Sequence, residues 1–378
     1  MKIGRIETFF VPPRWLFVRV ESDDGATGWG EASLEGHAEA VDGAFAALRD
    51  RFIGADPANI EDIWQVAYRG GFYRGGPVLM SALSGLDQAL WDLKGKTHGL
   101  PVHQLLGGAV RQRVQAYAWI GGDRPDDVGE AAAARRAQGF AAVKMNATAE
   151  ADWLARPDID AVIARVQAAQ AQGVAVGLDF HGRLHRPAAK QLARALEPLN
   201  LMFIEEPLLS ENPQGLSQLG ALVSTPIALG ERLYSRWDFR PFLEAGMVDI
   251  IQPDLSHAGG ISECRRIAAM AEAHDVAVAP HCPLGPLALA ACLQLAGCTP
   301  NVVLQEMSLG IHYNQGHDLL TFVRNPDVLT PVDGCLAIPQ GHGLGVEIDE
   351  AAVRAADKDR HRWRNPVWRS PDGSFAEW

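Results

Sequence analysis

Short apolar runs alternate with helical segments through the middle and later parts of the chain. Eight such runs follow one another, at 114–119, 141–145, 174–179, 201–205, 226–230, 248–252, 276–280 and 302–305. The seven gaps between them carry the spacing of apolar residues that is typical of helices. A strand, a helix and two short loops take roughly 25 residues in a parallel β/α barrel. The pattern therefore predicts an α/β fold with a (β/α)7β modified TIM barrel over residues 113–337.

The chain before the barrel has a different pattern. Residues 3–10 and 16–20 read as strands, and Asp24-Gly25 is a turn signal before a third short strand. From Gly36 onward the pattern is helical, with one buried helix face marked by Met80, Leu83, Leu86, Leu90 and Leu93. We therefore expect a separate α+β domain over residues 1–112, and we expect the tail, residues 338–378, to pack on it.

Composition narrows the class of partner. The chain has 378 residues, a net charge of −12 and no run of basic residues, which argues against a nucleic-acid or anionic membrane surface. Its five cysteines show no CxxC spacing and fit a reducing compartment. The N-terminus lacks a signal-peptide pattern, and no apolar stretch is long enough to span a bilayer. These features predict a cytoplasmic protein.

Acidic residues follow the apolar runs at similar intervals. Asp179, Glu205 and Glu231 end the third, fourth and fifth predicted strands and are separated by 26 residues each. The carboxyl ends of barrel strands meet on one face, so these three carboxylates should converge. A lone acid is more simply a helix cap or an ion-pair partner, but three in register predict a metal site. All-oxygen ligation favours Mg²⁺, or Mn²⁺, over zinc.

Two histidines belong to the same predicted rim. His181 follows Asp179 by two residues, and an extended strand places such residues on one face, so both side chains are predicted to enter one pocket. His281 ends the seventh strand beside Asp254, which ends the sixth. The carboxylate of Asp254 can hold one ring nitrogen of His281 and leave the other facing the pocket as a general base. A single histidine is more often a packing residue, but the acidic partner favours a catalytic pair.

Several motifs resemble the mandelate racemase branch of the enolase superfamily. They are Phe203-Ile204-Glu205-Glu206-Pro207, Gly230-Glu231-Arg232, the segment from Gln252 to Ile261, and the histidine of the seventh strand. The segments 177–182, 280–286 and 305–314 and the ending Trp363-Arg364-Asn365-Pro366 resemble more closely the D-galactonate dehydratase family. The resemblance covers nearly the whole chain and is weakest over 147–160. It implies that the N-terminal domain and the tail form a cap over the barrel, with Gly30 and the loop 71–76 above the substrate.

The resemblance also implies catalytic roles. A Mg²⁺ ion would bind the carboxylate and 2-hydroxyl of an aldonate, and His281 would remove the C2 proton. Glu306, at the end of the eighth strand, would stabilise the enediolate, donating a hydrogen bond if it is protonated. His181 would protonate the departing 3-hydroxyl, leaving a 2-keto-3-deoxy acid.

The second predicted strand ends in a sequence that argues against racemisation. Racemases of this branch carry Lys-x-Lys there, and this chain has Lys144-Met145-Asn146, so the second base is absent. The resemblance implies that Lys144 assists the substrate carboxylate and that Asn146 binds its hydroxyls, and we predict His312 as a further substrate-binding residue.

Three alternatives remain open at the level of sequence. The metal site would equally serve a dehydratase or epimerase that acts on another acid sugar, because the rim loops select the substrate. A barrel retained as a binding protein would lack a ligand or a base, and a zinc hydrolase would use histidine ligands in place of acids. We expect a small anionic sugar-acid substrate, no nucleic-acid or membrane partner, and a homo-oligomer.

Overall fold

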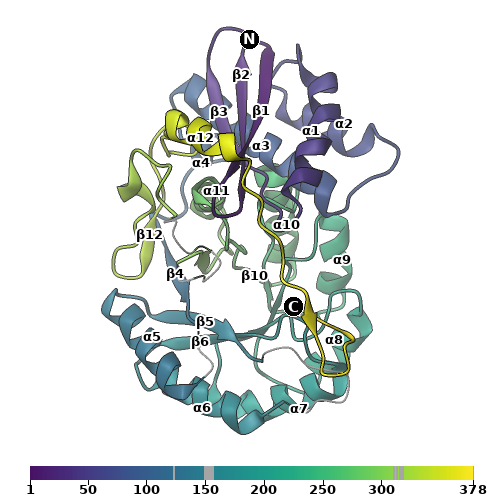
Figure 1. The fold of residues 1–378 in the computed structure, drawn as a ribbon, viewed down its shortest axis with the longest axis vertical. Coiled ribbons are helices and arrows are strands. Elements are labelled where there is room, and N and C mark those ends of the chain that lie inside the picture. Colours follow the sequence, from purple (N-terminus) through teal and green to yellow (C-terminus); the bar gives the residue numbers. More distant parts are fainter. Residues whose placement is uncertain (122–123, 149–156, 310, 312–313, 315–318, 378) are drawn as a thin grey trace.

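The computed structural model describes residues 1–378 except 122–123, 149–156, 310, 312–313, 315–318 and 378. In Figure 1 the N-terminal elements form one body above a ring of strands and helices. The arrangement confirms the predicted α/β fold, in which an α+β domain lies against a barrel of parallel strands.

The N-terminal domain begins with an antiparallel sheet in the order β1-β2-β3. Its strands are β1 (Ile3–Val11), β2 (Trp15–Ser22) and β3 (Thr27–Glu31). Four helices follow: α1 (Ala38–Phe52), α2 (Ile60–Arg69), α3 (Pro77–His98) and α4 (Val102–Leu105). Proline in the first turn of α3 and a left-handed Gly99 at its end match the usual helix boundaries. The predicted apolar face of α3 is buried against the sheet and the neighbouring helices.

The barrel contains the eight predicted parallel strands. They are β4 (Arg113–Trp119), β5 (Ala142–Asn146), β6 (Ala175–Asp179), β7 (Phe203–Glu205), β8 (Ile227–Leu229), β9 (Ile250–Ile251), β10 (Ala277–Val278) and β11 (Gln305–Met307). Their order in the sheet is β10-β9-β8-β7-β6-β5-β4-β11. A parallel bridge joins Val278 of β10 to Val302, three residues before β11, so the sheet closes on itself. Every strand therefore ends on one common rim.

Within the described residues, seven α-helices alternate with these strands, as predicted. They are α5 (Pro125–Ala137), α6 (Ile159–Gln170), α7 (Arg186–Leu196), α8 (Pro213–Gly220), α9 (Arg236–Glu244), α10 (Gly260–Ala273) and α11 (Pro286–Cys298). The apolar runs of the strands are buried on both faces, which is why they read as continuous rather than alternating. A small cluster that includes Tyr117, Phe203 and Ile250 is separate from the larger outer core.

The tail connects the two parts of the molecule. Strand β12 (Cys335–Ala337) pairs antiparallel with β4, and helix α12 (Glu350–Ala356) lies against the N-terminal domain, where Arg354 pairs with Glu7 at 2.9 Å. The chain then runs down to the barrel near α8, where β13 (Trp368–Arg369) pairs with β14 (Phe375–Ala376). Short 3₁₀ helices lie at Glu197–Leu199, Pro326–Leu329 and Asp357–Asp359. This part of the chain thus contacts the barrel at β12, then the N-terminal domain at α12, and then the barrel again, and the predicted domain boundaries stay predictions.

Two further expectations bear on the class of protein. All five cysteines carry free thiols, and three of them are buried. Among the residues that the structure describes, no helix combines the length and apolarity needed to cross a membrane.

Candidate active site

A cavity opens at the carboxyl ends of the barrel strands. Its volume is about 510 Å³, within the range of small-molecule sites. Strand register brings the predicted residues to this end, because Asp179 pairs with Asn146 on one side and with Glu205 on the other. Six of the predicted site residues line the cavity: Lys144, Asn146, His181, Glu231, His281 and Glu306.

One group of side chains is close enough to hold a metal ion. A ligand atom from each of Asp179, His181 and Glu231 lies within 4.8 Å of the other two. Asp179 Oδ2 is buried and accepts no hydrogen bond from the described residues, although His181 Nε2 lies 3.0 Å away. The carboxylates of Asp179 and Glu231, with one oxygen of Asp179 left without a hydrogen bond from the described part of the chain, fit a divalent cation.

The route by which His181 reaches Asp179 differs from the predicted one. The strand ends at Asp179, and His181 has a φ of 50°, so it lies in a left-handed turn and not in an extended strand. The turn is fixed by the backbone N–H of His181, which donates to Asp179 Oδ1 at 2.8 Å. The two side chains meet because the chain turns back on the carboxylate, and not because residues alternate along an extended strand.

Glu205 lies beside this group but has other partners. Lys144 Nζ donates to its Oε1 at 2.7 Å, and Gln252 Nε2 donates to its Oε2 at 2.7 Å. Its neighbour Glu206 is fully buried in the wall, where it accepts a hydrogen bond from the backbone of Gly230. The structure places Glu205 on the strand next to Asp179 with both oxygens engaged, and its role as a third metal ligand stays a prediction.

Lys144 is the buried cation of the site. Its Nζ lies 2.7 Å from Glu205, 2.8 Å from Glu306 and 3.6 Å from Asp179. Burial acts to lower the pKa of Lys144, but the negative charges of Glu205 and Glu306 outweigh it and raise that pKa well above its usual value. Burial likewise raises the pKa of Glu205, which the charge of Lys144 only partly offsets. The ammonium group therefore neutralises acids that would otherwise repel one another.

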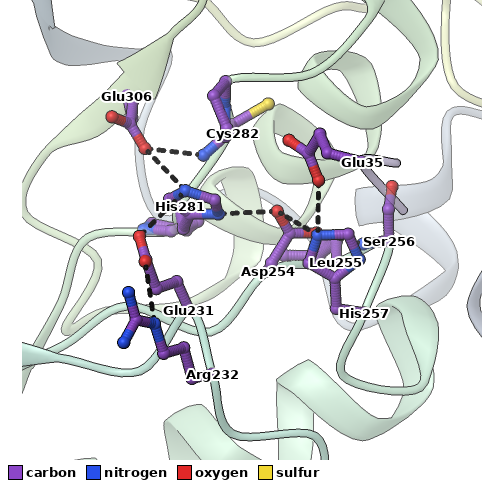
Figure 2. A network of polar contacts seen from close by, with 12 residues as sticks. Glu35, Glu231, Arg232, Asp254, Leu255, Ser256, His257, His281, Cys282 and Glu306 are labelled. Carbon is purple, nitrogen blue, oxygen red and sulfur yellow. Dashed lines mark hydrogen bonds and ion pairs between the residues drawn. The ribbon is translucent and has the colours of Figure 1, made fainter. Parts of the chain in front are cut away.

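Asp254 and His281 form the predicted pair. His281 Nδ1 lies 2.8 Å from Asp254 Oδ2, and the other ring nitrogen, Nε2, lies 3.2 Å from Glu231 (Figure 2). Burial acts to lower the pKa of His281, but the charges of Glu231 and Glu306 and the bond to Asp254 outweigh it and raise that pKa well above its usual value. The pair leaves Nε2 of His281 directed at the cavity.

Glu306 completes the rim on the last strand. Its Oε1 faces Lys144, and its Oε2 accepts the backbone N–H of Cys282 at 2.8 Å (Figure 2). Both oxygens therefore act as acceptors, and the predicted donation from a protonated Glu306 requires Lys144 to move away. Of the predicted substrate-binding residues, Lys144 and Asn146 line the cavity, and His312 lies outside the described residues.

The N-terminal domain reaches the cavity through residues that the sequence did not single out for it. Arg14, Leu34 and Glu35 line it, together with His257 of the barrel. Neither Gly30 nor the loop 71–76 is among the described residues that line the cavity, so their place above the substrate stays a prediction. A side chain at Gly30 would meet Gly85 O at 2.3 Å, so this glycine allows β3 to pack on α3. Spacing in the sequence gave no signal for Arg14 or Glu35. For His257 there was such a signal, because it lies three residues after Asp254.

Two family comparisons cover most of the chain. Residues 11–107 match the mandelate racemase/muconate lactonizing enzyme N-terminal domain. Residues 127–352 match the enolase C-terminal domain-like family.

Curated relatives match the chain over its full length. Two D-galactonate dehydratases, from Ralstonia nicotianae and Ralstonia pickettii, are 53% and 54% identical over 382 residues and are themselves covered completely. A third, from Pectobacterium atrosepticum, is 52% identical with the same coverage.

Solved structures share the whole fold. A crystal structure of an enolase from Agrobacterium radiobacter, with bound Na and L-malate, has a TM-score of 0.91 and 33% identity and covers 100% of both chains. A member of the enolase superfamily from Salmonella Typhimurium has a TM-score of 0.85 and 29% identity and covers 93% of this chain and 97% of its own.

Proposed function

We propose that this chain, which belongs to the mandelate racemase branch of the enolase superfamily, removes water from D-galactonate to give 2-dehydro-3-deoxy-D-galactonate. At the coarser level the chain is a sugar-acid dehydratase, a hydro-lyase, because its full-length relatives are 52–54% identical and carry that activity in their names. The substrate and the roles of individual residues are our proposal.

The observation that carries the proposal is the placement of the two histidines around Glu231. His281 Nε2 lies 3.2 Å from Glu231, and His181 belongs with Glu231 to the group within 4.8 Å. Their strands, β10 and β6, are four places apart in a closed ring of eight, so the two imidazoles enter from opposite sides. An anti elimination needs a base on one face of the substrate and an acid on the other.

The chemistry of the donor set supports a divalent cation. Asp179 and Glu231 would hold Mg²⁺, and Glu205 would join them if its oxygen bound the ion in place of Lys144. The bound ion would supply positive charge that acidifies the C2 proton of a carboxylate substrate. An acidic protein can bind an anion at such a centre. Mn²⁺ has the same preference for oxygen ligands.

His281 is proposed as the general base. Asp254 holds Nδ1, which fixes the ring and leaves Nε2 toward the substrate. Lys144 and Glu306 lie at the adjacent rim. The positive charge of Lys144 can stabilise the enediolate that forms when the C2 proton leaves, and Glu306 can do so by donating a hydrogen bond if it is protonated.

His181 is proposed as the general acid for the departing 3-hydroxyl. Its backbone is held by Asp179 Oδ1 and by Arg232, which donates to His181 O at 2.9 Å. Lys144, paired with Glu205 and Glu306, is not available as a second base, which supports dehydration over two-base racemisation. Asn146 lines the cavity beside it and is proposed to bind substrate hydroxyls.

A screen of acid sugars tests the substrate. The purified enzyme with Mg²⁺ is incubated with D-galactonate and with aldonates and aldarates that differ in configuration at C2, C3 or C4, and release of 2-keto acid is measured. We expect D-galactonate to give the highest kcat/KM. A higher value for another sugar would move the proposal to that substrate.

Deuterium exchange separates the two histidines. In D₂O, His181→Gln should exchange the C2 proton of unreacted galactonate while it forms little product, because deprotonation no longer leads to loss of water. His281→Gln should do neither. Proton NMR of the C2 signal gives the answer, and exchange that is lost in His181→Gln but kept in His281→Gln would reverse the assignment.

A further inference from the structure

Asp254 faces two imidazoles and not one. Its Oδ1 accepts the backbone N–H of Ser256 at 2.6 Å, which fixes the orientation of the carboxylate. Its Oδ2 lies 2.8 Å from His281 Nδ1 and 3.7 Å from Nε2 of His257 (Figure 2). The oxygen that orients the proposed base is therefore also the one that faces His257.

The N-terminal domain determines where His257 lies. Glu35 Oε2, in the segment after β3, is 3.5 Å from His257 Nε2, and Ser81 Oγ, on α3, is 3.2 Å from His257 Nδ1. The side chain of His257 is 5% exposed, so it has little freedom to turn away. Ser81 can donate or accept, so Nδ1 has a partner in either protonation state, whereas Nε2 must carry a proton to interact favourably with the two carboxylates.

Glu35 is itself anchored to the segment that carries His281. Arg14 Nη1 lies 3.2 Å from Glu35 Oε1, and Arg14 Nη2 donates to the carbonyl of Pro283 at 2.9 Å. Pro283 lies two residues after His281. The N-terminal domain therefore contacts the segment that carries His281 through Arg14, and it reaches Asp254 through His257.

Charge favours the same arrangement. Burial acts to lower the pKa of His257, but Asp254 and Glu35 outweigh it and raise that pKa above its usual value. Burial acts to raise the pKa of Glu35, but the bond from His257 and the charge of Arg14 outweigh it and lower the pKa to about 2. The charge of His281, whose ring centroid lies 6.5 Å from that of His257, acts against this charge. A cationic His257 between two carboxylates is thus held by both.

We propose that His257 is a positioning residue, which couples docking of the N-terminal domain to the orientation of the Asp254–His281 pair. His257, held by Glu35 and Ser81, keeps Asp254 Oδ2 turned toward His281. The inference rests on the proposed function only in taking His281 as the base. His257 also lines the cavity, so a direct contact with substrate is the alternative that the test must separate.

A double-mutant cycle tests the coupling. We compare kcat and KM of the Mg²⁺-loaded enzyme with galactonate for wild type, His257→Gln, Asp254→Asn and the double variant. If His257 acts through Asp254, His257→Gln should lower kcat by about tenfold or more, with KM within about twofold. In the Asp254→Asn background the same change should cost less than about threefold.

His103 offers a matched control. It is buried, and its Nδ1 lies 2.9 Å from Gln294 Oε1, away from the cavity. His103→Gln should have the same effect on kcat with and without Asp254→Asn. Equal effects of His257→Gln in both backgrounds would overturn the proposal, and a rise in KM with unchanged kcat would assign His257 to substrate binding instead.

A measurement without substrate keeps the two proposals apart. The Nδ1–H proton of His281, hydrogen-bonded to Asp254, should give a downfield proton signal in enzyme labelled with ¹⁵N-histidine. Asp254→Asn should remove it, His257→Gln should shift it, and His103→Gln should leave it in place. An unchanged signal in His257→Gln would overturn the inference. A wild type that does not act on galactonate would instead contradict the proposed function, while the NMR result would still decide the role of His257.

Discussion

The β6–β8 side of the cavity and the β9–β10 side are held by different parts of the chain. On the first, Asp179, His181 and Glu231 make their ion pairs with Lys144, Arg232 and His281, which are all barrel residues. On the second, the segments after Asp254 and His281 contact the N-terminal domain at several points. Contacts within the barrel position the proposed metal group, whereas contacts with a second domain support the segments that carry the proposed base.

Two buried carboxylates of the N-terminal domain account for much of that docking. Glu31 accepts the backbone N–H groups of Gly285 at 2.8 Å and Ala288 at 3.0 Å, at the start of α11. Asp87 accepts the backbone N–H of Ser262 at 3.0 Å, at the start of α10. Helix N-termini favour negative charge, and these two helices follow the strands of His281 and Asp254. The N-terminal domain therefore supports the segments that carry the proposed base, in addition to lining the cavity.

The largest expected effect falls on the metal side. Glu205→Gln should abolish turnover, by about 1,000-fold or more, because it removes a charge from the proposed ion site and from Lys144. The fold should persist, as circular dichroism would report. Activity is measured against added Mg²⁺, and turnover that survives in this variant, or in excess chelator, would mean that the β6–β8 side holds no essential ion.

On the other side, Asp254→Asn should cost up to about 10⁴-fold in kcat, by analogy with the amidation of the aspartate in a catalytic triad. Substrate affinity and Mg²⁺ affinity should stay near those of the wild type, because the metal group belongs to other strands. Steady-state kinetics and calorimetry check this. A rate near that of the wild type would show that His281 does not depend on Asp254.

Glu31→Gln should weaken the β9–β10 side and leave the β6–β8 side unchanged, with a smaller effect than the two substitutions above. An amide cannot accept from both Gly285 and Ala288 without placing its own N–H₂ against a donor, so we expect a loss of about 1–3 kcal/mol in unfolding free energy. The value of kcat should fall with it, while Mg²⁺ affinity should not change. Asp87→Asn is the matched variant on α10. Weaker Mg²⁺ binding in either variant would show that the two sides are held together.

The smallest expected effect is a pH dependence at Glu35. With its pKa lowered to about 2, this carboxylate stabilises the folded protein above the unfolded value of 4.5, and its contribution is lost as pH falls from there toward 2. The difference in unfolding free energy between wild type and Glu35→Gln should therefore shrink between pH 6 and pH 3. Denaturant unfolding at several pH values measures it. A constant difference would mean that Glu35 is not ionised in the docked domain.

The sequence by itself determined the barrel and the side chains at its rim. Apolar runs buried on both faces mark parallel strands, and in a barrel all strands end on the same face, so Asp179, Glu205, Glu231, Asp254 and His281 had to lie there. The family resemblance added chemical roles to those positions. Both kinds of inference depend on residues that lie close together in the sequence.

The tertiary structure alone decided which of these groups touch. Lys144 forms ion pairs with Glu205 and Glu306, which lie on other strands. The imidazole of His181 reaches Asp179 because of the turn at His181 and not because of strand alternation. Glu35 and His257 are more than 200 residues apart in the chain, and no periodic pattern records their contact. The local pattern of apolar and polar residues specifies which face of a helix or strand is buried. Contacts between domains depend instead on how the surfaces of two folded domains fit together.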